Sequence, residues 1–459
     1  MSAKLIIDEQ QLWTSQRSFL MASIGFAVGL GNIWRFPYIV GENGGAAFLI
    51  VYLLAAFCIG VPLLIAEMMI GRRGGGSPLH ALIAVARESA APRAWGAVGL
   101  AAIATVFVIL TFYAVVAGWT IDYLVRAASN QFSGLSADGA SELFDGLLAD
   151  PARMAFWQAV VLLLTVFIVM RGVRNGIETA VNVLMPALFA CLVLMVIYSA
   201  FIGDLSAGLK FLLEPDFTKM TVTTILIAVG QAFFSIGIAM AGMMAYGAYL
   251  PKHVSIPKSA VTIVAMDATV ALMAGLAIFP IIFANGLEPS DGPGLIFKSL
   301  PLAFGSMYGG QFFGTCFFLL VVTAAITSCI GSLEPLVSWA EEYWNSGRKK
   351  CSIILGLLIW VLGLGTVFSF NRWSSFYPLV SIPVLSGKTI FEVQNFLASN
   401  VLLLLGAASM SVFAGWVVPE KSAMEELHCS GGLLFNCWRF ITRYVAPVFL
   451  LIILFMSVL

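Results

Sequence analysis

An unusual group of residues lies inside the first membrane-length apolar segment. It contains three glycines, an asparagine and an arginine: Gly25, Gly29, Gly31, Asn32 and Arg35. Hydrocarbon offers no partner for an unsatisfied peptide group, so a helix loosened here must face protein, water or a ligand. An arginine at that depth is costly and needs a partner or a polar cavity. The segment therefore predicts a binding site in mid-membrane.

The composition gives the class of protein around this site. The chain has 459 residues, of which 60% are hydrophobic and 10% charged, and its mean hydropathy is +0.97. These values predict an integral α-helical membrane protein within the lipid bilayer. The net charge is zero, so a nucleic-acid partner is not expected. The seven cysteines show no paired spacing, and the three histidines are scattered, which argues against disulfides and metal ligation.

Apolar windows predict eleven spans, and their charge asymmetry predicts the orientation. Most of the 24 Lys and Arg residues fall on the side that holds the N-terminus. We therefore expect a multi-pass protein of the cell membrane, with a cytoplasmic N-terminus and, after an odd number of spans, an external C-terminus. The windows are residues 15–41, 45–71, 96–126, 154–171, 178–203, 220–250, 259–284, 308–342, 351–370, 389–418 and 436–458.

A second interruption lies in the sixth window, near Ser235, Ile236 and Gly237. Two broken spans in corresponding positions indicate a transporter built from inverted repeats. The predicted division is a cytoplasmic segment 1–14, a first repeat 15–203, a second repeat 204–418, and a cytoplasmic loop with the last span at 419–459.

Four motifs resemble the signature of the neurotransmitter:sodium symporter family. They are GLGNIWRFP at 29–37, ENGG at 42–45, QAFFS at 231–235 and TS at 327–328. The resemblance runs from about residue 10 to the end of the chain. It implies an all-α membrane fold of 5+5 inverted repeats, with discontinuous helices 1 and 6 and one extra C-terminal helix, as in bacterial eleven-helix members.

The resemblance implies two sodium sites. In the first, the Ala27 carbonyl and the side chains of Asn32, Ser235 and Asp267 hold the ion, and the substrate carboxylate completes the shell. Asp267 stands where many relatives carry Asn. The alternative is a buried acid paired within the helices, although no basic residue lies nearby in sequence.

The second sodium site would use main-chain carbonyls and two hydroxyl groups. The residues are Gly25, Val28, Ala324, Thr327 and Ser328. Alternatively, the two hydroxyls bond only to carbonyls one turn earlier in their own helix.

Chloride is not expected to be required. Tyr52, Gln231 and Ser235 match the anion ligands of chloride-dependent relatives, but Ala271 replaces a serine. Asp267 would supply the fixed negative charge instead, and a proton on it would accompany the return step.

The resemblance also implies a substrate pocket. The substrate carboxylate would meet the amides of Leu30 and Gly31 and the Tyr113 hydroxyl, because Gly29 lacks the Asp of amine carriers. Gly237 resembles the glycine of GABA, taurine and betaine carriers and would widen the site. The expected lining is Phe26, Ala27, Leu30, Gly31, Ile109, Tyr113, Phe234, Ser235, Gly237, Met240, Ser328 and Ser332.

Gates are expected on both sides of the pocket. Arg35 would pair with Asn395 or, after a register shift, with Glu392. On the cytoplasmic side, Trp13 and Glu342 are present, but Gln10 replaces the usual Arg, for which Arg17 would have to compensate. Supporting roles fall to Glu67, Gln231 and Tyr52, and Gly176 with Pro186 would let the fifth span unwind.

The sequence thus predicts a sodium-coupled symporter that imports a neutral, apolar amino acid by alternating access. The chain shows no Walker-type phosphate loop, no repeated channel filter and no catalytic constellation, so an enzyme is not expected. One alternative is a carrier of GABA, taurine, betaine or a similar ω-amino acid. Another is a membrane sensor that does not transport. The oligomeric state stays open.

Overall fold

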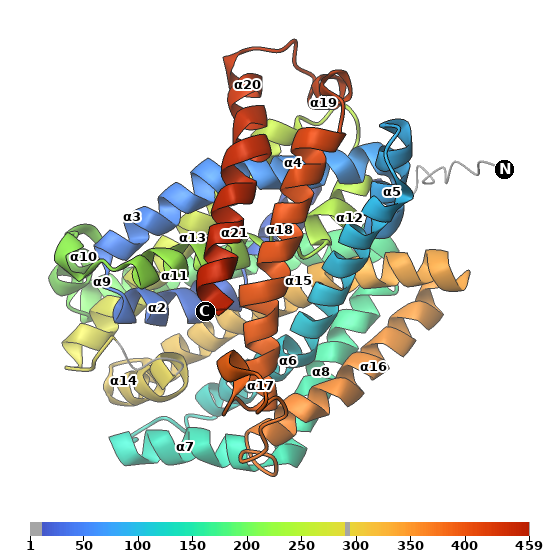
Figure 1. The fold of residues 1–459 in the computed structure, drawn as a ribbon. Coiled ribbons are helices and arrows are strands. Elements are labelled where there is room, and N and C mark those ends of the chain that lie inside the picture. The colour runs from blue at the N-terminus through green and yellow to red at the C-terminus, as the bar shows by residue number, and fades with distance from the viewer. Residues whose placement is uncertain (1–11, 290–293, 459) are drawn as a thin grey trace.

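The computed structural model describes residues 12–289 and 294–458, and these residues form a helical membrane protein (Figure 1). Among them, nine helices are long and apolar enough to cross a membrane. A bent pair, α1 (Gln16–Ala27) and Gly31–Glu42, which ends in α2 (Phe36–Glu42), makes a tenth span. The shorter helices α11 (Val222–Ile236) and α12 (Gly242–Ala248) follow one another in the sixth predicted window. The interrupted first and sixth spans are therefore confirmed.

The remaining spans coincide with the predicted windows, usually to within a few residues. They are α3 (Ala46–Ala55) with α4 (Val61–Gly74), α6 (Gly96–Ala128), α8 (Pro151–Val169), α9 (Thr179–Ile202), α13 (Ile256–Ala284), α15 (Gly310–Trp344), α16 (Arg348–Ser369), α17 (Ile390–Phe396) with α18 (Leu403–Val412), and α20 (Leu433–Phe440) with α21 (Ala446–Val458).

Shorter helices connect the spans. They are α5 (Pro78–Glu88), α7 (Ala137–Ala149), α10 (Leu205–Leu213), α14 (Leu300–Ser306) and α19 (Glu420–Leu427). Polar side chains start several helices: Ser77 accepts from the His80 amide, Ser136 from Gly139 and Asp150 from Arg153. Each cap satisfies one of the free amides at a helix N-terminus and so fixes where the helix begins.

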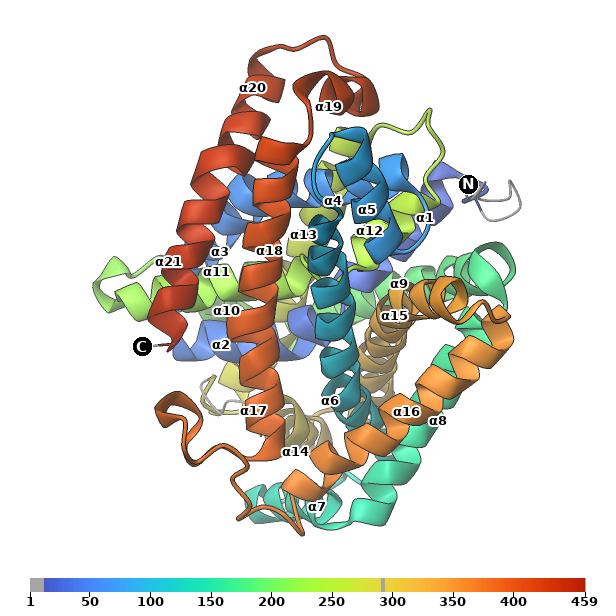
Figure 2. The ribbon, with the colours of Figure 1, turned by 45° about the vertical axis from the view of Figure 1, so that its right-hand side comes forward.

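The centre of the molecule is built on α15 and α6, which pack against one another. The most apolar stretch of α15 is 83% buried, more than in any other described span. Helix α1 packs on α15, and α12 packs on α4 and α15. Both broken spans therefore lie against the same buried helices, whereas α8 and α16 lie side by side at an edge of the molecule (Figures 1 and 2).

The fifth span is helical through both residues that were expected to let it unwind. Gly176 lies in a π-helical turn, Val173–Glu178, and Pro186 lies inside α9. A π-helical turn departs from regular α-helical hydrogen bonding. The irregular part of the fifth span therefore lies at its start, before Pro186.

Candidate functional site

The first break separates α1 from a π-helical turn, Gly31–Arg35, with a bend of 48° across the pair. Val28 has an extended backbone (φ −74°, ψ 93°), which ends the helix. Side chains take over the freed amides: Leu30 N–H donates to the Tyr113 hydroxyl at 3.0 Å, and Gly29 N–H donates to the Asn32 side chain at 3.3 Å. The break is thus held by polar side chains rather than by helical hydrogen bonds.

The second break runs from Gly237 to Ala241, and three of its residues have positive φ. The angles are +75° at Gly237, +62° at Ala239 and +61° at Ala241. Left-handed backbone costs an alanine roughly 1–2 kcal/mol, so the surroundings must hold it in place. The buried carboxylate of Glu67 accepts the Ala239 amide at 2.5 Å. This contact gives Glu67 the supporting position that the family resemblance implied.

Asp267 lies where the two broken spans meet. Its carboxylate accepts hydrogen bonds from the Asn32 amide at 2.8 Å, the Ser235 hydroxyl at 2.8 Å and the Tyr52 hydroxyl at 3.1 Å. All four side chains are buried, and the three donors to the carboxylate carry no charge. A buried carboxylate without a charged partner is expensive, and a bound cation removes that cost. Ala27, the fourth residue expected at the first sodium site, ends α1 and lines the adjoining cavity.

The residues expected at the second sodium site lie together between α1 and α15. The Ser328 hydroxyl donates to the carbonyls of Phe26 at 3.1 Å and Gly25 at 3.4 Å. A side-chain carbon added at Gly25 would lie 3.2 Å from Thr327 Cβ, so the two helices are in close contact. The Thr327 hydroxyl bonds to the Ala324 carbonyl at 3.0 Å, which is the helix-internal bond given above as the alternative.

A small cavity of about 30 Å³ lies between the two breaks. Every residue expected in the substrate pocket lines this cavity, with the exception of Leu30. Gly29 also lines it. Leu30 instead lines the larger cavity next to it. A side-chain carbon at Gly29 would lie 2.7 Å from the Tyr113 hydroxyl, so no acidic side chain fits there. At Gly29 the cavity therefore presents main-chain and hydroxyl groups to a ligand and carries no negatively charged side chain.

The structure corrects the reason given for Gly237. The glycine was expected to widen the pocket, but the Phe26 ring fills the space beside it: an added side-chain carbon would lie 2.6 Å from that ring. The same ring also crowds Gly242 and Gly331. Gly237 is therefore favoured by its positive φ and by the packing of Phe26, whose ring occupies the space that a side chain would take.

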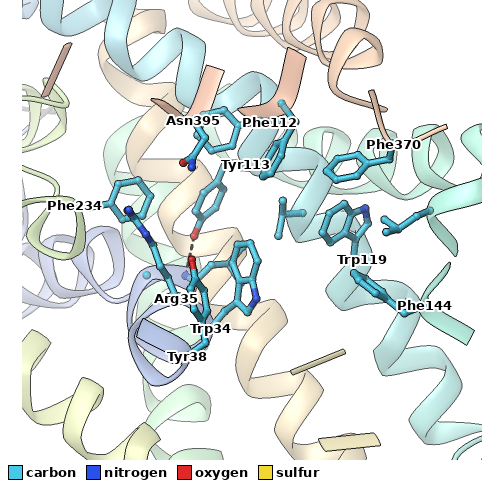
Figure 3. Close-up of a pocket in the computed structure, with 15 residues that line it drawn as sticks. Trp34, Arg35, Tyr38, Phe112, Tyr113, Trp119, Phe144, Phe234, Phe370 and Asn395 are labelled. Atoms are coloured by element: carbon cyan, nitrogen blue, oxygen red, sulfur yellow. Dashed lines mark hydrogen bonds between the residues drawn. The ribbon is translucent and has the colours of Figure 1, made fainter. Parts of the chain in front are cut away.

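A larger cavity of about 220 Å³, here called the vestibule, adjoins the small one (Figure 3). Gly31, Tyr113 and Phe234 line both cavities, so these residues separate them. The remaining lining is mostly aromatic and comes from the first break with its π-helical turn, from α2, α6 and α7, and from the residues around α16 and α17: Leu30, Trp34, Arg35, Tyr38, Phe112, Val116, Trp119, Phe144, Leu148, Phe370, Phe391 and Asn395. Most of these residues were not expected, because spans and loops far apart in sequence contribute single side chains.

Arg35 stacks on an aromatic ring in the vestibule. Its guanidinium carbon lies 4.5 Å from the centre of the Phe234 ring, and Figure 3 shows the two side chains together. Asn395 lines the same vestibule and accepts from Ser399 at 3.4 Å; no hydrogen bond joins it to Arg35 among the described residues. Glu392, the other expected partner, accepts the Thr389 amide at 2.7 Å and caps α17, so its carboxylate is turned to its own helix.

The opposite side of the small cavity is closed by Trp13, which is 2% exposed. Its indole donates to the Tyr246 carbonyl at 3.1 Å, and its amide donates to the Tyr249 carbonyl at 3.2 Å. The next residue, Thr14, bonds to the Glu178 carboxylate. The short segment before α1 is therefore attached to both the sixth and the fifth spans.

Glu342 does not take part in this closure. Its carboxylate accepts the Ser77 amide at 2.6 Å and also the Ser77 hydroxyl, and so it supports the start of α5. The expectation of a latch through Glu342 is therefore corrected. Gln10, which stands in place of the usual latch arginine, lies outside the described residues. Arg17 is exposed.

An ion pair on this side was not expected. Glu334 is fully buried and pairs with Arg348, and it also accepts from the Tyr249 hydroxyl at 3.0 Å. The signal was an acid between a leucine and a proline inside the apolar eighth span. A buried acid in a membrane span needs such a partner.

Two broken helices around a cavity with buried polar groups are the architecture of a secondary transporter with inverted repeats. Comparison with known proteins agrees. The model of the sodium:neurotransmitter symporter family matches residues 10–136 and 147–459. An uncharacterized sodium-dependent transporter of Bacillus subtilis, YhdH, is 38% identical, and the match covers 96% of each chain. The sodium-dependent serotonin transporter of Drosophila melanogaster is 27% identical over 98% of this chain and 76% of its own.

A solved structure resembles the whole fold. The crystal structure of MhsT in complex with L-phenylalanine matches with a TM-score of 0.89 and 37% identity, covering 98% of this chain and 100% of that one. The chain therefore belongs to the sodium:neurotransmitter symporter family, and it is a sodium-dependent membrane transporter.

Proposed function

We propose that the protein is a symporter that imports a neutral, apolar α-amino acid together with sodium. The observation that carries the proposal is the buried Asp267 carboxylate, which contacts Asn32 at the first break and Ser235 on the helix that leads to the second. A sodium ion there would lie beside a substrate carboxylate placed at the Leu30 and Gly31 amides. The solved relative that holds L-phenylalanine supports this class of substrate.

The same contacts give a mechanism for coupling. A cation beside Asp267 neutralises the buried charge and attracts the substrate carboxylate, so sodium raises the affinity for substrate. Reciprocity then requires that substrate raise the affinity for sodium by the same factor. Trp13 closes one side of the small cavity, and the vestibule lies on the other side. This arrangement supports alternating access in which the substrate enters from the vestibule.

Two sodium ions are proposed. The first uses Ala27, Asn32, Ser235 and Asp267, and the second uses Gly25, Val28, Ala324, Thr327 and Ser328. Chloride is not required in this proposal, because Asp267 supplies the negative charge and bonds to Tyr52 at 3.1 Å. Gln231 donates instead to the Gly31 carbonyl at 2.9 Å and so supports the first break. The N-terminus is proposed to be cytoplasmic and the C-terminus external.

A ligand screen tests the proposal. Thermal stability in detergent is measured with each of twenty amino acids, GABA, taurine and betaine, with sodium or with potassium. We expect apolar α-amino acids to raise the melting temperature only in sodium. Stabilisation by an ω-amino acid alone would identify the other class of carrier. A ligand that stabilises the protein but is not taken up above the empty-vesicle background, in proteoliposomes with sodium outside, would indicate the sensor.

A further inference from the structure

An apolar groove of about 290 Å³ lies between α8 and α16, far from the central cavity. Its lining is Ala159, Leu162, Leu163, Val166, Ile353, Gly356, Leu357 and Trp360. Leu163 is 68% exposed and Leu357 is 60% exposed, so the groove opens outward. In a membrane protein, a surface of this kind faces lipid chains.

Hydrogen bonds join the two helices at both ends of the groove. At one end the Arg348 side chain donates to the Val169 carbonyl at 2.8 Å. At the other end the Trp360 indole donates to the Ala155 carbonyl at 3.1 Å. The helical rise between Arg348 and Trp360 is about 18 Å, close to the ~15 Å depth of one leaflet of the hydrocarbon core. The two joined ends are thus about one leaflet apart, and the groove lining between them, residues 353–360 on α16, spans about 10 Å and can hold part of one acyl chain.

Exposed basic residues gather at the Arg348 end, whereas Arg153 near the other end pairs with Asp122. Arg171, Arg174, Lys349 and Lys350 are all exposed there. Glu334 and Glu341 pair with Arg348, and Glu178 bonds to Thr14. No ion pair of the four exposed residues is formed within the described part of the chain. Four cations are therefore available to an anion at the membrane surface.

The charges lie in line with the groove. Along α16, Lys349 precedes Ile353, Gly356 and Trp360 by four, seven and eleven residues, which is the spacing of one helix face. Just beyond the end of α8, the Arg171 guanidinium lies 4.0 Å over the ring of Phe167, which is one turn beyond Leu163. The bonds from Arg348 to Val169 and from Trp360 to Ala155 make the two helices antiparallel, so a basic residue follows each wall of the groove at the same end. Figure 2 shows α8 and α16 side by side.

We propose that this groove binds one anionic phospholipid, with an acyl chain between α8 and α16 and the phosphate among Arg171, Arg174, Lys349 and Lys350. Basic clusters beside grooves between spans are suited to anionic headgroups, and a chain in the groove adds specificity for a lipid over free phosphate. In the proposed orientation the site faces the cytoplasmic leaflet. The site would connect the loop before the fifth span to the start of the ninth.

Native mass spectrometry in detergent tests the site with two probes, palmitoyl-oleoyl phosphatidylglycerol and the matching phosphatidylcholine. We expect the anionic lipid to bind at least tenfold more tightly. The variant R171Q/R174Q/K349Q/K350Q should lose that preference. The matched control R87Q/R93Q/K252Q/K258Q removes four exposed charges from the same side, outside the groove, and should keep it. Equal loss in both variants would show general charge attraction and overturn the proposal.

Two further experiments distinguish binding through the acyl chain from binding through the headgroup. Ala159→Leu with Leu357→Trp fills the groove without changing charge and should weaken phosphatidylglycerol binding several-fold. Glycerophosphoglycerol, which is the headgroup without chains, should bind poorly to every form. The proposal fails if the groove-filling variant binds phosphatidylglycerol as tightly as the wild type. It also fails if the mass spectra show dimers formed through the groove in place of lipid adducts. If the quadruple variant shows no melting transition, the double variant Lys349→Gln with Lys350→Gln takes its place. It should reduce the logarithm of the preference for phosphatidylglycerol over phosphatidylcholine by about half.

Discussion

The two breaks that form the central site are stabilised in different ways. At the first, Tyr113 and Ser328 hold the backbone, and both also line the small cavity. At the second, Glu67 holds the Ala239 amide, and Glu67 does not line that cavity. A ligand in the cavity competes for the partners of the first break but leaves the partner of the second untouched. The first break is therefore the one expected to respond to substrate and sodium, and the second is a permanent support.

The largest effect is expected from Asp267→Asn, because Asp267 contacts both broken spans. Loss of one partner of a buried charge pair costs roughly 3–5 kcal/mol, so half-maximal activation should need roughly a hundredfold to several thousandfold more sodium. The neutral side chain should also create a need for chloride. Uptake into proteoliposomes is measured against sodium, in chloride and in gluconate.

Asp145→Asn is the control for this change, since Asp145 is exposed and bonds to Lys298 at 3.1 Å, far from the cavity. Unchanged sodium activation in Asp267→Asn would remove the carboxylate from the ion site and with it the link between the two breaks.

A smaller effect is expected from Thr327→Ala with Ser328→Ala, which alters only the first break. Two lost ligands of about 1 kcal/mol each should weaken sodium activation roughly tenfold to thirtyfold. Thr315→Ala on the same helix is the control, because its exposed hydroxyl makes only a helix-internal bond to the Gln311 carbonyl. Sodium-dependent uptake that is identical in the double variant and the control would show that the two hydroxyls only back-bond within α15.

The second break is tested through stability. Glu67→Ala leaves the Ala239 amide without its charged acceptor, and such a bond is worth about 1.5–3 kcal/mol. We expect a lower melting temperature in detergent with little change in the substrate concentration for half-maximal uptake. Glu67→Gln keeps an acceptor and should recover part of the loss. A change in substrate affinity without a change in stability would contradict the division between a responsive and a permanent break.

Much of this site could be predicted because the motifs carry its backbone chemistry. Glycines and an asparagine located the first break, and QAFFS led directly to Gly237. Contacts between distant side chains could not be read in the same way. The role of Gly237 depends on the position of the Phe26 ring, and the role of Glu342 depends on its contact with Ser77. The vestibule was missed for the same reason, since α7 contributes Phe144 from a loop without an aromatic pattern.

The smallest effect is expected from Tyr113→Phe, and it is also the sharpest test of the first break. The change removes only the hydroxyl that accepts the Leu30 amide at 3.0 Å. One hydrogen bond contributes about 0.5–1.5 kcal/mol, so the substrate concentration for half-maximal uptake should rise up to about tenfold. Tyr123→Phe is the matched control, because that buried hydroxyl has no partner among the described residues. Because the substrate carboxylate is proposed to meet the same hydroxyl and amide, the loss should appear in substrate affinity and leave the melting temperature without substrate nearly unchanged. A fall in the melting temperature with unchanged affinity would mean that Tyr113 only braces the helix, and that the first break is as permanent as the second.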